Sequence, residues 1–457
     1  MIAIVESRAD RASTHICEHL LELTDWDERE DDERADGDGG GTYYRTAGAE
    51  LRSFDDLHLD LERPADAFAG DPDVLVFASR HSGNTGPLLT AHCTGNFGPA
   101  EFGGDDDAVA EACPNALAEL LTAFDRYAPD EYDTGLECTH HGPTDVGCPS
   151  LFAELGSDDE QWDDPDGARA VARAILDLRN VPPYRERQLV GFGGNHYVPR
   201  FERIVRETPW AVGHVAADWS LETMGSPAEH RNVIDQAFAA SDATHAVIDG
   251  EWPALETVVT DLGYRVVSET WVRAVDDRPL ELVSAVESAL GTVEKGVRFG
   301  SQRTDRFSVV DLPTELLEAA ESIDPDAVWE AVERATVAFE TRNGGSRIGT
   351  RAALPASIAD ADADADEGSM KTADSQLETK IVSTAASVLE QRYETVTVTD
   401  DAVTVEEVAF DPSLARDAGV PEGPKFGRLA NGESVTIDGN VIAPSDVCRR
   451  RTKSFAR

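Results

Sequence analysis

The sequence is poor in lysine and cysteine and contains no long apolar segment. Only five of its 457 residues are lysine, and no two of its six cysteines form a C-x-x-C pair. No run of about 18 apolar residues occurs, so we expect no membrane span. The first ten residues, MIAIVESRAD, lack the basic segment and apolar core of a secretory signal. We therefore expect a cytoplasmic protein whose cysteines are free thiols.

Several familiar catalytic motifs are also missing. The sequence has no H-E-x-x-H, which excludes the helical zinc-protease arrangement, and no G-x-S-x-G, which argues against the usual α/β-hydrolase serine. It has no G-x-x-x-x-G-K-[ST] phosphate loop, and GFGG at residues 191–194 is too little to indicate a dinucleotide site. Any catalytic function must therefore depend on other residues.

Basic residues are scarce relative to acidic ones. The chain has 88 Asp and Glu against 40 Lys and Arg, a formal net charge of −48, and the acids are spread along its whole length. Such a surface suits a halophilic cytosol, where salt screens the repulsion between carboxylates. Disorder is the alternative, but regular apolar segments argue against it for most of the chain. The acidity does not exclude a nucleic-acid partner, because molar salt weakens phosphate contacts in any case.

Apolar strands alternate with amphipathic helices over the first 275 residues. Strands are expected at 1–7, 74–78, 87–96, 135–139, 187–194, 209–216, 243–250 and 264–274, and helices at 12–23, 107–127, 166–179 and 200–207. This alternation predicts an α/β fold with a mixed, largely parallel sheet flanked by helices.

The remainder of the chain differs in character. Helices are expected near 279–293, 313–322 and 326–341, and the acidic repeat SIADADADADEGS, residues 357–369, is expected to be a disordered linker. A helix at 375–392 followed by alternating segments indicates a small α+β C-terminal extension. We divide the chain into a catalytic domain at 1–345, with a core at 1–275 and a helical extension at 276–345, a linker at 346–376 and a C-terminal module at 377–457.

The histidines are unevenly distributed. Six of the 11 lie between residues 81 and 214, most of them within or just after an apolar run: His81, His92, His140, His141, His196 and His214. Because ligands of open α/β sheets bind outside the carboxyl ends of the strands, adjacent strand ends would bring these imidazoles into one crevice. Histidine together with carboxylate suits zinc, whose catalytic form leaves one position open for water.

The pair His140–His141 stands in LECTHHGPTD, between an apolar run and a Gly-Pro break. Adjacent side chains on a strand point to opposite faces, so one imidazole could ligate a metal while the other contacts a carboxylate or the substrate. One core histidine beside one exposed histidine is the alternative. The neighbouring Cys138 and Cys148 are possible ligands, although burial as small apolar residues is the expectation we favour.

Five short stretches together resemble the archaeal and plant type of D-aminoacyl-tRNA deacylase. They are SRHSG (79–83), HCTGNFG (92–98), THHGPTD (139–145), GFGGNHYVPRF (191–201) and VGHVAADW (212–219), and they occur in the family's order. The resemblance implies a zinc-dependent hydrolase that cleaves the ester between a D-amino acid and tRNA. It also implies a fold like the cores of peptidyl-tRNA hydrolase and nucleoside phosphorylase.

The resemblance carries the site assignment. We expect Zn²⁺ ligands among His81, His140, His196 and His214, with Glu137 or Asp218 as further ligands or orienting groups. His92, His141 and Glu154 are expected to act in catalysis, and Asn195 and Arg200 in substrate binding. The expected partner is D-aminoacyl-tRNA, and the expected state is a monomer that does not bind membranes.

Two other functions remain open. One is a different zinc-dependent ester or amide hydrolase on the same fold, and the other is a metal-stabilised protein that binds tRNA ends. The tail GVPEGPKFGRLANGESVTIDG, residues 419–439, weakly resembles a segment of tRNA 3′-processing metallo-hydrolases. It is either a tRNA-contacting appendage or a packing element.

Overall fold

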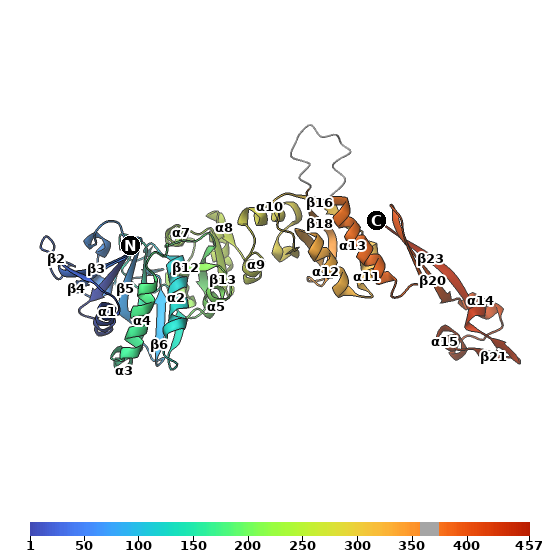
Figure 1. The fold of residues 1–457 in the computed structure, drawn as a ribbon, viewed down its shortest axis with the longest axis horizontal. Helices are drawn as coiled ribbons and strands as arrows, with labels where there is room; N and C mark the ends of the chain where they lie inside the picture. Colours follow the sequence, from blue (N-terminus) through green and yellow to red (C-terminus); the bar gives the residue numbers. More distant parts are fainter. Residues whose placement is uncertain (357–373) are drawn as a thin grey trace, which may run out of the picture. The chain divides into compact units, whose positions relative to one another are not determined.

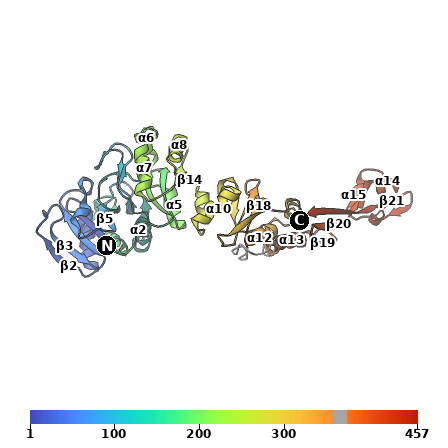
Figure 2. The same ribbon diagram turned by 90° about the horizontal axis from the view of Figure 1, so that it is seen from above.

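The computed structural model describes residues 1–356 and 374–457. The chain divides into two compact units, Met1–Asp276 and Asp277–Arg457, each with its own apolar cores (Figures 1 and 2). Within the described residues, no helix combines the length and the apolar character needed to cross a membrane.

An eight-stranded mixed sheet forms the first half of unit 1. Its order is β2 (Asp27–Asp31), β3 (Gly41–Thr46), β4 (Ala49–Phe54), β1 (Ile2–Ser7), β5 (Val74–Arg80), β10 (Ser150–Gly156), β6 (Leu88–His92) and β9 (Asp133–Leu136). The four strands from β4 to β10 run parallel, and β6 and β9 run together in the opposite direction. The short pair β7 (Gly95–Asn96) and β8 (Ala108–Val109) lies beyond β6 in the chain.

Helices cover one face of this sheet and leave part of the other face for polar side chains. Helices α1 (Arg11–Leu23), α2 (Pro114–Tyr127) and α4 (Pro165–Asp177) pack together against β5, β6 and β10, and the short α3 (Asp159–Trp162) adjoins them. Asp10 begins α1 by accepting hydrogen bonds from the backbone N–H groups of Ala12 and Ser13. Since side chains alternate along a strand, Phe152 and Glu154 of β10 share the face away from these helices.

A second, all-parallel sheet completes unit 1. Its order is β12 (Ala211–Ala216), β11 (Gln188–Gly193), β13 (His245–Asp249) and β14 (Arg265–Val266), with helices α5 (Pro199–Glu207), α6 (Asp218–Met224), α7 (Arg231–Ala240), α8 (Pro253–Asp261) and α9 (Glu269–Ala274). The expected α/β fold with a mixed, largely parallel sheet is confirmed. The expected strand at 264–274 is wrong, because only its first residues pair and the remainder forms α9, capped by Ser268.

Unit 2 is built around an antiparallel sheet, β15 (Val297–Phe299), β17 (Ala338–Arg342), β18 (Arg347–Pro355) and β16 (Phe307–Asp311). Its helices are α10 (Leu280–Leu290), α11 (Thr314–Glu321), α12 (Pro325–Ala335) and α13 (Asp374–Leu389). A second sheet contains β19 (Thr395–Val398), β20 (Ala402–Phe410) and β23 (Cys448–Ala456), and the segment between β20 and β23 contains α14 (Pro412–Asp417), α15 (Pro424–Ala430), β21 (Val435–Ile437) and β22 (Asn440–Ile442).

The segments of unit 2 pack together in a way that differs from the domain boundaries expected from sequence. Strand β18 lies inside the range expected to be a linker, 346–376. One apolar core joins Leu316 of α11, Val332 of α12 and Ala385 of α13 to Phe455 of β23. The helical extension and the C-terminal module therefore share a core. The acidic repeat at 357–369 lies outside the described residues.

We expect a fragment ending at Asp276 to fold and to bind metal with the stoichiometry of the whole chain, because Met1–Asp276 is a compact unit with apolar cores of its own. Thermal unfolding and metal analysis of the purified fragment would check this. A control fragment ending at Ala240 lacks β13, which lies inside the second sheet, and should fail to fold. Aggregation of both fragments would show that unit 2 completes unit 1.

Candidate active site

Polar side chains gather on the open face of the large sheet. Glu154 of β10 lies opposite Ser79 of β5 and Thr90 of β6, and His92 at the end of β6 lies opposite Phe152. His81 directly follows β5, and its backbone N–H donates to the Leu155 carbonyl. Because β5 and β6 run in opposite directions, their side chains meet across one face rather than at a shared edge of strand ends.

The segment that follows β9 connects the two sheets of unit 1. The Cys138 N–H donates to the carbonyl of His196, which follows β11, and the Thr139 N–H donates to the carbonyl of Val215 in β12. These bonds hold residues 137–141 between the large sheet and the second sheet. The segment thereby brings Glu137, Cys138, His140 and His141 beside His92 and His196.

Three imidazoles share one hydrogen-bonding pattern. The Nδ1 atoms of His92, His140 and His141 lie 2.9, 2.8 and 2.8 Å from the backbone carbonyls of Cys93, Cys138 and Gly142. A carbonyl can only accept a hydrogen bond, so each Nδ1 carries the proton and each neutral ring keeps the Nε2 lone pair. One ligand atom from each ring lies within 4.8 Å of the others. Backbone-oriented imidazoles of this kind are typical of metal sites.

Two further groups of possible ligands adjoin these rings. Cys138, His140 and His196 form one, with Cys138 Sγ 3.6 Å from His196 Nδ1. His81, Glu137 and Glu154 form the other, all three buried. Glu137 connects these two groups. Its carboxylate accepts a hydrogen bond of 2.8 Å from His196 Nε2 in the first group and lies 3.0 Å from His81 Nδ1 in the second.

Burial and charge act in opposite directions on His81 and Glu154, but in the same direction on His140 and His141. Burial opposes the charged form of His81, but the carboxylates of Glu137 and Glu154 outweigh it and raise the His81 pKa to about 10. Burial also opposes ionisation of Glu154, but His81 and His92 lower its pKa to about 2. Burial and the neighbouring His92 lower the His141 pKa to about 4, and burial and His141 lower that of His140 well below its usual value. His140 and His141 are therefore neutral near pH 7, as ligands must be.

The donor atoms fit a metal ion. Nε2 of His92 and Oε1 of Glu137 are buried and have no hydrogen-bond partner in the described part of the chain, although His81 Nδ1 lies near the latter. A buried polar atom without a partner destabilises a protein, and coordination of a cation would remove that cost. Imidazole, thiolate and carboxylate are together the ligand types of transition metals, zinc among them.

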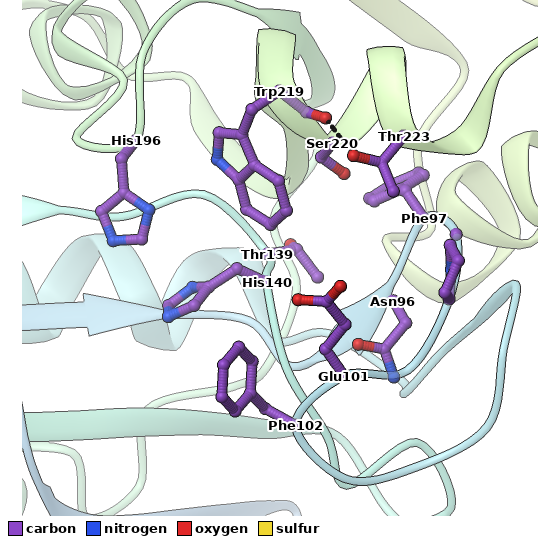
Figure 3. Close-up of a pocket in the computed structure, with 12 residues that line it drawn as sticks. Asn96, Phe97, Glu101, Phe102, Thr139, His140, His196, Trp219, Ser220 and Thr223 are labelled. Atoms are coloured by element: carbon purple, nitrogen blue, oxygen red, sulfur yellow. Dashed lines mark hydrogen bonds between the residues drawn. The ribbon is translucent and has the colours of Figure 1, made fainter.

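Two cavities meet at this cluster. One, of about 430 Å³, is called the polar cavity because most of its lining residues are polar or charged, among them Asp10, His58, Ser79, His81 and Glu154. The other, of about 330 Å³, includes Asn96, Phe97, Glu101, Trp219 and Thr223 (Figure 3). Phe102, His140 and His196 line both cavities. A substrate bound across the cluster would thus place a different group in each cavity.

Comparison with known proteins identifies the family. A family model for D-aminoacyl-tRNA deacylase matches residues 68–267. A D-aminoacyl-tRNA deacylase of Halorubrum lacusprofundi is 54% identical over 100% of this chain and 96% of its own length, and one of Natronomonas pharaonis is 52% identical over the whole of both chains. The chain belongs to the D-aminoacyl-tRNA deacylase family. The family resemblance expected from the five short motifs is confirmed.

A more distant relative agrees with this, and one solved structure is similar in sequence and fold. A relative from Methanoregula boonei, also described as a D-aminoacyl-tRNA deacylase, is 30% identical over 98% of this chain and 96% of its own length. A crystal structure of the conserved protein of unknown function AF0625 is 28% identical, with a TM-score of 0.53 over 59% of this chain and 95% of the other. The relatives therefore extend through unit 2, which lies beyond the segment that the deacylase model matches.

Three residues expected at the active site from sequence lie apart from the cluster. His214 is fully buried in β12, where its Nε2 donates to the Ala110 carbonyl at 2.8 Å and its Nδ1 lies 3.1 Å from the Thr139 hydroxyl. Both nitrogens are thus bound to protein, and we remove His214 from the expected ligands. Asn195 caps the turn at Tyr197, and Arg200 is held by Asp249 and Glu269. Neither of these two lines either of the two cavities at the cluster.

Four other residues that line the two cavities were not identified from the sequence. Asp10 and His58 line the polar cavity, but they come from a helix cap and a short 3₁₀ turn that carry no recognisable motif. Phe102 and Trp219 line the second cavity. A possible signal for Phe102 is its place in a polar, Gly-rich loop, where a large aromatic residue has no core to fill.

Proposed function

We propose that the protein hydrolyses the ester bond of D-aminoacyl-tRNA with the aid of Zn²⁺ and releases a free D-amino acid and tRNA. The observation that carries this proposal is the full-length match to D-aminoacyl-tRNA deacylases. The histidine–carboxylate cluster between two cavities supports it, since an ester needs a reactive centre with room on both sides. We place the enzyme in the cytoplasm, as a monomer.

His140 is the central residue for holding the ion. It belongs with His92 and His141 to one group and with Cys138 and His196 to another. When bound, zinc would supply Lewis acidity and make water nucleophilic near neutral pH. Backbone carbonyls orient the rings of His92, His140 and His141, so little rearrangement is needed to hold the ion.

Glu154 is placed to move protons. Its two carboxylate oxygens lie 3.6 Å from His81 Nδ1 and 3.6 Å from His92 Nε2. It also lines the polar cavity, so it can take a proton from the attacking water and return it to the leaving ribose oxygen. His81, held by Glu137 and Glu154, carries the positive charge that keeps this carboxylate ionised.

Hydrolysis of D-tyrosyl-tRNA and L-tyrosyl-tRNA tests the proposal. We expect the D-form to be cleaved at least about 100-fold faster, and a chelator to abolish cleavage until zinc is restored, because the proposed chemistry depends on the ion. Release of amino acid from labelled aminoacyl-tRNA measures both effects. Equal cleavage of the two forms would favour a general ester hydrolase. Tight tRNA binding by the zinc-loaded protein without cleavage would favour a tRNA-end binding protein.

A further inference from the structure

Two large aromatic side chains are exposed at the mouth of the second cavity. Phe102 is 60% exposed and Trp219 is 45% exposed, and the other large apolar residues exposed in the described chain are all valines. Both aromatic residues line the cavity that contains His140 and His196. Figure 3 shows them on different sides of the space in front of His140. Exposed aromatic surface is unfavourable in water and marks ligand-binding surfaces when it is concentrated at one place.

The backbone under each ring is held in place. The Phe102 carbonyl accepts a hydrogen bond from Gly142 N–H, and the carbonyls of Gly103 and Asp105 accept bonds from the Asn96 side chain. A Cβ on Gly103 would lie 2.2 Å from the Leu59 carbonyl oxygen, so the loop packs too closely there for any other residue. The Phe102 side chain is therefore exposed even though the backbone of its loop is held in place.

Trp219 is anchored in a similar way. It lies in the first turn of α6, whose Asp218 exchanges hydrogen bonds with the backbone of Gly194. Two rings on fixed backbones form a preformed site for a planar group, with little conformational entropy to lose on binding.

Two polar groups of this cavity, Asn96 Oδ1 and the Glu101 carboxylate, can accept hydrogen bonds from a ligand. The Asn96 side-chain NH₂ group donates hydrogen bonds to the carbonyls of Gly103 and Asp105. Its Oδ1 therefore remains available as an acceptor. Glu101 adds a carboxylate to the lining. Adenine has a planar ring and an exocyclic amine, which is a hydrogen-bond donor, so it matches both the aromatic faces and the acceptors.

We propose that Phe102 and Trp219 form the stacking site for the terminal adenine of tRNA, so that the amino acid occupies the polar cavity on the other side of His140. This inference rests on the proposed function for the identity of the substrate. Every tRNA presents the same terminal base, whereas the amino-acid side chain varies, and a rigid aromatic site suits the invariant group. The net charge of −48 disfavours phosphate as the main contact, while stacking contributes binding energy without a charged partner.

Three substrates distinguish contacts to the base from contacts to the amino acid. We expect Trp219→Ala and Phe102→Ala each to raise KM for D-tyrosyl-tRNA and for 3′-O-D-tyrosyl-adenosine by roughly 5- to 150-fold, the range for loss of one stacked base. Hydrolysis of D-tyrosine methyl ester, which has no base, should change less than twofold in Trp219→Ala, because Trp219 lines only the second cavity, whereas Phe102 lines both. Trp219→Tyr should restore most of the affinity, because it keeps an aromatic face. Val309→Ala, an exposed apolar residue of unit 2, is the matched control.

Binding of adenosine gives a second readout that does not depend on catalysis. Calorimetric titration should show adenosine binding by the zinc-loaded full chain and by Val309→Ala, and its loss in the two aromatic-to-alanine variants. An equal rise in KM for the methyl ester would assign the cavity to the amino acid and overturn the proposal. So would unchanged kinetics with all three substrates, or unaltered adenosine binding in both variants. Failure of the wild type to cleave any ester while it binds adenosine would overturn the proposed function alone.

Discussion

Replacement of His140 by alanine is expected to reduce the rate of D-aminoacyl-tRNA hydrolysis by about 10³-fold or more and to remove the bound metal. His140 is the residue shared by two of the three groups of possible ligands, so its loss leaves neither group complete. His141→Ala removes a ligand from only one group and should retain metal at saturating zinc, with a smaller loss of rate. Elemental analysis of the purified proteins and steady-state kinetics measure the two effects separately.

His19→Ala is the matched control for His140→Ala. His19 lies in α1 and pairs with Glu22, away from both cavities. This variant should keep wild-type metal content, and its rate should change less than twofold. Full metal occupancy and a near-normal rate in His140→Ala would contradict the assignment of the site. Loss of metal in the His19 variant would show that metal content reports overall folding instead.

The melting temperature should rise steeply with salt, by on the order of 10 °C between 0.1 and 2 M KCl. The net charge of −48 repels itself, and the Debye length falls from about 10 Å at 0.1 M to about 3 Å at 1 M salt. The structure places many of these acids in water. In edge strand β2, for example, Asp27, Glu28 and Glu30 are all exposed. Thermal melts at a series of KCl concentrations measure the effect.

Neutralising exposed carboxylates provides the control for the salt prediction. Glu28→Gln combined with Asp32→Asn removes two negative charges from exposed positions. This double variant should melt at a slightly higher temperature than the wild type in 0.1 M KCl and at the same temperature in 2 M KCl. A melting temperature that stays flat or falls with KCl would remove the interpretation of the acidic surface as an adaptation to high salt.

The local pattern of apolar and polar residues was sufficient to predict most of the helices and strands. The apolar run VLVFASR became β5, and the helical spacing of residues 166–179 became α4. The pattern was insufficient where strand and helix signals overlap. Residues 264–274 are rich in β-branched and aromatic residues, yet most of them form α9, because Ser268 caps a helix there and Trp271 packs into the core. A cap depends on one side chain, which a periodicity count does not register.

The domain boundaries depended on contacts that are distant in the chain. The acidic repeat at 357–369 separates two segments whose compositions differ, and a boundary there was the natural expectation from sequence. The apolar faces of α11 and α13 nevertheless pack in one core with Phe455 of β23. Composition reports whether a segment can bury apolar surface, but it does not report which other segment covers that surface.

The sequence by itself determined the acidic surface, the alternation of strands and helices, and the family, because composition, periodicity and short motifs are local properties of the chain. Only the tertiary structure decided which histidines meet. His92 and His214 both belong to apolar strands, yet register places His92 on the open face of the large sheet, whereas His214 is enclosed between Thr139 and Ala110. The pairing of exposed Phe102 with Trp219 likewise depends on how the two sheets are joined. Strand order and register are set by the packing of the whole unit, so the composition of the site followed from contacts that no single segment encodes.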